Sequence, residues 1–95
     1  MAIKVRDFEV RLTRNKEERR LVRQLRYDVF VTEEGASATP EQQELHEEYD
    51  AYDTYADYMA VFHNGKIVGA YRIIGQRMHA TFRRYYQTPF LFWKY

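Results

Sequence analysis

The sequence predicts a small α+β domain with an N-terminal strand, two helices, an antiparallel hairpin and an aromatic C-terminal segment. Apolar and charged residues alternate at residues 8–12, and apolar residues recur at helical spacing between residues 21 and 30. An Asn-Gly pair separates two apolar runs near residue 64. With 95 residues, the chain has room for one domain, residues 1–95, with a core of modest size.

The first strand and the first helix follow from these spacings. Residues 8–12 (FEVRL) alternate with a period of two, which is typical of a half-buried strand. Asn15 is a suitable N-cap, and Glu18 stands three positions later, as in a capping box. We therefore expect a helix over residues 16–31, ending before Gly35.

The second helix and the hairpin each have a local signature. Thr39, followed by proline and then by Gln42, predicts a short polar helix over residues 40–48. Residues 58–62 and 67–74 read as strands, and Asn64-Gly65 tolerates the positive φ angles of a type I′ turn between them.

The C-terminal part of the sequence is harder to interpret. Residues 81–87 fit one or two helical turns, and residues 90–95 (FLFWKY) end the chain in an aromatic run. Exposed aromatic residues favour association. We expect this run to dock on the hairpin, to be covered by sequence further downstream, or to mediate self-association as a homo-oligomer.

Composition and charge exclude several functions. The chain has no cysteine, no apolar run long enough to span a membrane and no signal peptide, so we expect a soluble, cytoplasmic protein. Residues 31–60 contain nine acidic and no basic residues, which disfavours nucleic-acid binding. This block either pairs with the basic flanking segments or forms a functional acidic patch. The three histidines have no metal-ligand spacing, so we expect no metal site.

Three short motifs occur in order along the chain. They are LRYDVF at residues 25–30, YDAYD at residues 49–53 and GAYRI at residues 69–73. This order resembles the N-terminal half of GNAT-fold N-acyltransferases, in particular the bacterial acyl-homoserine-lactone synthases and the ornithine-lipid, or hemolysin-like, acyltransferases. Those families share an L-R-x-x-V-F helix end, an acidic F-D-x-x-D segment and a strand that ends G-x-x-R-L.

The resemblance implies which residues form the site. Asp50, Asp53 and Arg72 match catalytic positions, and Arg26, Phe30 and Glu33 match positions around the acceptor and the acyl chain. A carboxylate can bind an amine as its ammonium form and, directly or through water, remove a proton before attack. Two carboxylates three positions apart repel unless cations such as arginines balance them.

Each of these residues also has a purely structural explanation. Asp50 and Asp53 fit a turn cap and a solvated acid, and Arg26 fits an exposed helical arginine. Phe30 fits a core position, Glu33 an exposed helix end, and Arg72 a partly buried ion pair within an apolar strand.

The resemblance implies an acyl thioester donor, either acyl-CoA or an acyl-carrier protein, and a small amine acceptor. The glycine-rich loop that holds such a donor at a helix N-terminus is not recognisable in the sequence. We therefore expect no cofactor site in this chain, a match to the acceptor half of such an enzyme, and no activity of the chain alone. The alternative is a non-catalytic binding module derived from the same fold, which pairs through its aromatic C-terminal edge.

Overall fold

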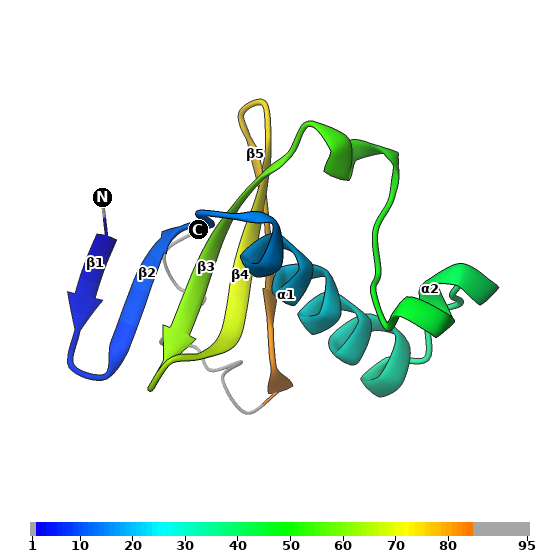
Figure 1. Ribbon diagram of the computed structural model, residues 1–95, viewed down its shortest axis with the longest axis horizontal. Coiled ribbons are helices and arrows are strands. Elements are labelled where there is room, and N and C mark those ends of the chain that lie inside the picture. Colours follow the sequence, from blue (N-terminus) through cyan, green and yellow to red (C-terminus); the bar gives the residue numbers. More distant parts are fainter. Residues whose placement is uncertain (1, 85–95) are drawn as a thin grey trace.

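The computed structural model describes residues 2–84, which form one antiparallel sheet with a helix on one face (Figure 1). The five strands are β1 (Ala2–Val5), β2 (Phe8–Leu12), β3 (Asp57–His63), β4 (Lys66–Ile74) and β5 (Arg77–Phe82). They lie in the sheet in the order β1-β2-β3-β4-β5. The predicted α+β class is confirmed.

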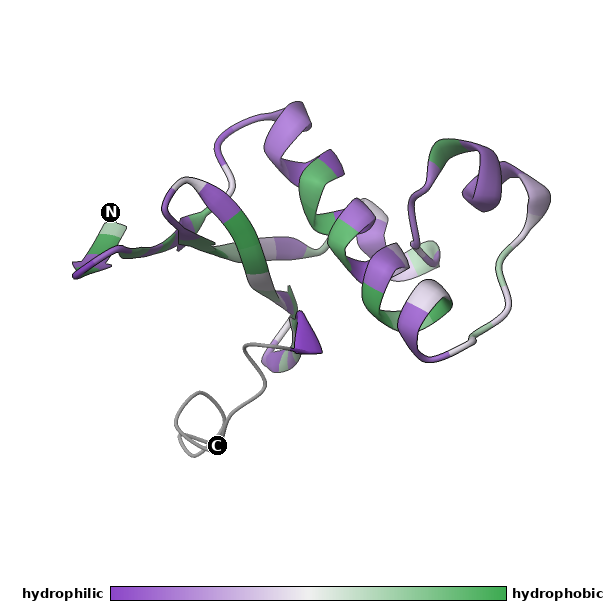
Figure 2. Ribbon diagram, turned by 90° about the horizontal axis from the view of Figure 1, so that it is seen from below, coloured by the Kyte–Doolittle hydropathy of each residue, from purple (hydrophilic) through white to green (hydrophobic). Residues whose placement is uncertain are grey.

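Between β2 and β3, the chain forms four helical segments. They are the α-helix α1 (Lys16–Arg26), the π-helix η1 (Tyr27–Glu33), the α-helix α2 (Pro40–Leu45) and the 3-10 turn η2 (Ala51–Thr54). Figure 2 shows α1 on one side of the sheet. The side chains of Val22, Leu25 and Val29 are buried there against Tyr58 and Ala60 of β3.

The opposite face of the sheet is also apolar. Its buried residues are Val61, Val68, Tyr71 and Phe82. Gly69 lies opposite Phe82 in the pairing of β4 with β5, and the Phe82 ring covers it. A Cβ atom on residue 69 would lie 2.1 Å from Phe82 Cδ1, so this glycine is required by close packing and not by its backbone angles.

Most predicted element boundaries are confirmed, with two changes. The strand at residues 8–12 and the hairpin are present, and Asn64 and Gly65 have φ angles of 52° and 80° as a type I′ turn requires. The first helix reaches Glu33, but beyond Arg26 it is a π-helix. The second helix is shorter than predicted, because His46 adopts a left-handed conformation with φ 57°.

The prediction of one or two helical turns over residues 81–87 is wrong at its start, although Arg84 has a 3-10 conformation. Thr81 and Phe82 end strand β5 and do not begin a helical turn. The aromatic run at residues 90–95, and with it the predicted docking or self-association through that run, lies outside the described residues. Within residues 2–84, no helix is long and apolar enough to cross a membrane.

Candidate acceptor site

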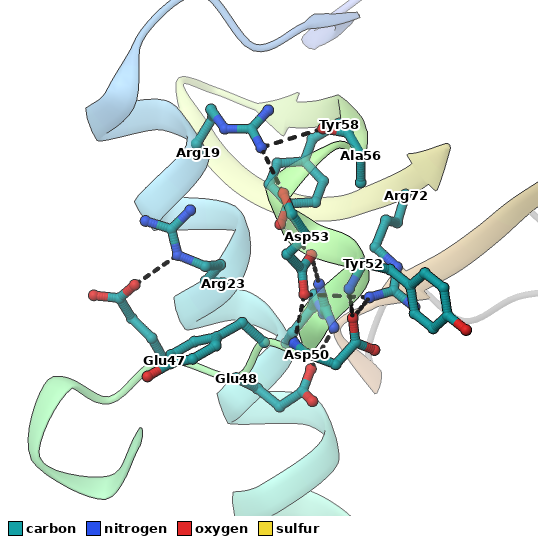
Figure 3. Close-up of polar contacts among 12 residues, drawn as sticks. Arg19, Arg23, Glu47, Glu48, Asp50, Tyr52, Asp53, Ala56, Tyr58 and Arg72 are labelled. Atoms are coloured by element: carbon teal, nitrogen blue, oxygen red, sulfur yellow. Dashed lines mark hydrogen bonds and ion pairs between the residues drawn. The ribbon is translucent and has the colours of Figure 1, made fainter. Parts of the chain in front are cut away.

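The acidic segment, residues 47–53, connects α2 to β3 and lies against α1. Its carboxylates pair with arginines from two elements that are distant in the sequence, as Figure 3 shows. Arg23 Nε donates to Glu47 Oε1 at 2.7 Å, and the Glu48 amide donates to the Arg23 carbonyl oxygen at 3.0 Å. The segregated charges of the sequence therefore neutralise one another to a large extent in the folded chain.

Local sequence determines the shape of this segment. Asp50 has extended backbone angles and caps η2, because its Oδ1 accepts a hydrogen bond from the Tyr52 amide at 2.9 Å. Asp53, three positions later, accepts from the Asp50 amide at 2.7 Å through Oδ2. This reciprocal arrangement is a capping box formed by two aspartates, and it holds both carboxylates on one turn.

Arg26 and Arg72 bring α1 and β4 to the same two carboxylates. Arg26 Nη1 donates to Asp53 Oδ1 at 2.5 Å. Arg72 Nη1 donates to Asp50 Oδ1 at 2.8 Å and to Asp53 Oδ2 at 3.2 Å. We call Arg26, Glu48, Asp50, Asp53 and Arg72 the carboxylate network.

Glu48 is the fifth member of this network and was not predicted from the sequence. Its Oε1 lies 2.7 Å from Arg26 Nη2 and forms an ion pair there without hydrogen-bond geometry. The network thus places three carboxylates against two guanidinium groups.

The two aspartates differ in accessibility. Asp53 is only 8% exposed, and both of its oxygens accept hydrogen bonds. The Asp50 side chain is 44% exposed, and its Oδ2 has no hydrogen-bond partner within residues 2–84. Asp53 is therefore built into the fold, whereas Asp50 presents an open carboxylate oxygen.

Tyr58 and Arg19 complete the environment of Asp53. The Tyr58 hydroxyl donates a short hydrogen bond to Asp53 Oδ1, and Arg19 Nη2 donates to the Asp53 carbonyl oxygen at 3.1 Å. Burial alone would raise the pKa of Asp53. The hydrogen bonds from Tyr58 and the Asp50 amide, together with Arg26, outweigh burial and hold this pKa below its usual value.

The other predicted residues lie apart from these contacts. Phe30, on η1, is half-buried and packs against the core between α1 and the sheet. Glu33, at the end of η1, lies 3.8 Å from Arg84 Nε, and no polar contact among residues 2–84 links it to the carboxylate network. Of the two tyrosines beside these aspartates, Tyr49 is half-buried and Tyr52 is 54% exposed.

Two signals in the sequence could have identified the missed residues. Arg19, Arg23 and Arg26 are spaced by four and three positions, which places them along one side of α1, where an acidic segment can lie. Tyr58 begins an apolar strand, and a buried tyrosine hydroxyl needs a partner.

The fold is that of a partial GNAT-like domain, a class whose members transfer acetyl or acyl groups. A family model described as an acetyltransferase (GNAT) domain matches residues 25–92, and the chain belongs to this family. No curated protein and no solved structure matches the chain. Membership implies an acyl donor and an amine acceptor as the kinds of molecule that the protein handles.

Proposed function

We propose that this protein takes part in acyl transfer from a thioester to an amine, in the manner of the acyl-homoserine-lactone synthases and the ornithine-lipid acyltransferases. The donor is an acyl-CoA or an acyl-carrier protein. The observation that carries this proposal is the open Oδ2 of Asp50, on a side chain that is 44% exposed. An ammonium group is the complement of such a carboxylate.

The residues of the network have different roles in this proposal. Asp50 binds the acceptor as its ammonium form and, directly or through water, takes up the proton that frees the nitrogen lone pair. Arg72 holds Asp50 Oδ1, so that the other oxygen remains available. Asp53 and Arg26 anchor the turn, because both are almost fully buried.

The reaction itself needs few further groups. The neutral amine attacks the thioester carbonyl carbon, the new C–N bond forms, and the C–S bond breaks. The nitrogen, which is positively charged after the attack, gives up its extra proton, and the thiolate takes up a proton and leaves as a free thiol. Phe30 lines the acyl or acceptor pocket, and Glu33 adds a second carboxylate on the acceptor side.

Residues 2–84 supply the acceptor side of this site. Within them, no glycine-rich turn leads into a helix, so the proposal concerns the acceptor side alone. The proposal is therefore tested on acceptor binding, which these residues should perform without a donor.

Titration with n-butylammonium, followed by NMR chemical shifts, measures that binding. We expect weak binding, with a dissociation constant no tighter than about millimolar, since one half-exposed ion pair contributes at most about 1 kcal/mol and millimolar affinity already needs about 4 kcal/mol. Asp50→Asn should abolish binding, and Asp57→Asn, which removes an exposed acid at the start of β3, should leave it unchanged. Equal binding by wild type and Asp50→Asn, or no binding by the wild type, would refute the proposal.

A further inference from the structure

Tyr58 contacts the carboxylate network from the buried face of the sheet. Tyr58 is a residue of β3, its side chain is fully buried between the sheet and α1, and its hydroxyl donates to Asp53 Oδ1. In the sheet, Tyr58 pairs with Arg72, which donates to the other oxygen of the same carboxylate. Neighbouring strands therefore hold the two oxygens of Asp53 through different donors.

Arg19 holds this arrangement from the side of α1. Its guanidinium carbon lies 4.5 Å from the centre of the Tyr58 ring. Its Nη2 donates to the carbonyl oxygens of Asp53 and Ala56 at 3.1 and 3.2 Å. Arg19 thus fixes both the ring of Tyr58 and the backbone that enters β3.

The hydrogen bond from Tyr58 persists over the physiological pH range. Burial, and then the hydrogen bond to Asp53, raises the pKa of Tyr58 to about 12. The phenol therefore remains neutral at pH 7 and acts as a donor to the ionised Asp53.

We infer that Tyr58, with Arg19 stacked on its ring, is a positioning residue for the amine site at Asp50. Tyr58 fixes Asp53 Oδ1, which orients Oδ2 toward the Asp50 amide and Arg72. Arg72 in turn holds Asp50 Oδ1, so the open Oδ2 of Asp50 has one defined direction. This inference rests on the proposed function, and it adds two residues that touch neither acceptor nor donor.

The test compares Tyr58→Phe with the wild type by two measurements. Phenylalanine keeps the ring under Arg19 and removes only the hydroxyl. Carbon-13 NMR of the side-chain carboxyl groups should show that the titration midpoint of Asp53 moves to higher pH, because a donor to the ionised form is lost. Binding of n-butylammonium should weaken about three- to tenfold, the effect of losing one hydrogen bond. Tyr55→Phe, at a position 68% exposed, should change neither measurement.

Each outcome of this test has a defined meaning. A folded Tyr58→Phe variant with wild-type amine affinity, or with an unchanged Asp53 midpoint, overturns the positioning role and leaves the proposed function intact. Absence of amine binding by the wild type overturns the proposed function and this inference together. If Tyr58→Phe does not fold, Arg19→Lys is measured in the same way. Lysine keeps the charge but lacks the planar guanidinium that stacks on the Tyr58 ring while Nη2 bonds both carbonyl oxygens. Wild-type affinity of this variant therefore overturns the inference.

Discussion

Replacing Asp53 by asparagine should destabilise the fold more than any other single change in the acidic segment. Four donors converge on this carboxylate, from Arg26, Arg72, Tyr58 and the Asp50 amide. The Arg26 side chain is only 6% exposed. Removing one partner of a buried ion pair typically costs about 3–5 kcal/mol. Because Arg26 keeps Glu48 as a second partner, we expect the lower end, about 3 kcal/mol.

Urea unfolding followed by far-UV circular dichroism measures this cost. With an m-value of about 1–1.5 kcal/mol/M, the midpoint should fall by about 2–3 M. Asp50→Asn is the matched control. Asp50 is half-exposed, and a surface pair contributes at most about 1 kcal/mol, so its midpoint should fall by less than about 1 M. Equal midpoints for the two variants would refute the view that Asp53 anchors the fold and Asp50 does not.

The same substitution should change the pH dependence of stability. The pKa of Asp53 lies below its usual value in the folded chain. The stability that it contributes is therefore present above the ordinary carboxyl pKa and is lost as the pH falls through the lowered value. The stability of Asp53→Asn should not show this decrease as the pH falls.

Two further predictions concern packing and a second ion pair. Gly69→Ala should cost about 1–3 kcal/mol in unfolding free energy, because the new methyl group would lie 2.1 Å from the Phe82 ring. The double variant with Phe82→Leu should show a favourable coupling, and additive losses would contradict this contact. Glu18 is bonded through both oxygens to Arg11 at 2.8 and 2.7 Å, which lowers its pKa from 4.5 to about 2. Glu18→Gln should cost about 1 kcal/mol above pH 4.5, after solvent screening, and the difference should vanish toward pH 2. Glu44→Gln, on exposed α2, is the control and should follow the wild-type profile.

Local patterns were sufficient to predict much of the fold. The hairpin was predictable because Asn64-Gly65 determines the turn and the flanking runs determine the register. The caps at Asn15 and Thr39 were predictable for the same reason. Glu18, however, does not complete the capping box at Asn15, because its carboxylate binds Arg11 instead. That choice depends on a tertiary contact that local sequence does not specify.

Two strands were missed for different reasons. The four residues of β1 are all exposed, so this strand has no buried face that a sequence pattern could reveal. In β5, Met78, Ala80 and Phe82 alternate with Arg77, His79 and Thr81, so the period of two that indicates a strand was present in the sequence and was overlooked. The change from α-helix to π-helix at Tyr27 has no evident signal in the sequence.

The sequence was sufficient to predict which residues form the candidate site, but not which of the two aspartates is buried and which is open. The motifs identified Arg26, Asp50, Asp53 and Arg72, and the structure brings these four together. Spacing alone could not show that one aspartate is buried and saturated while the other is open. That difference depends on Tyr58, which reaches only Asp53.

The most direct test of the central claim is to locate the bound amine. Intermolecular NOEs should connect the alkyl protons of n-butylammonium with the ring protons of Tyr52, whose exposed side chain adjoins Asp50 on the η2 turn. If the amine binds at Asp50, these NOEs appear together with shift changes at Asp50 and Arg72. NOEs to α2, where Glu41 and Glu44 are exposed acids, without any at Tyr52, would contradict binding at Asp50.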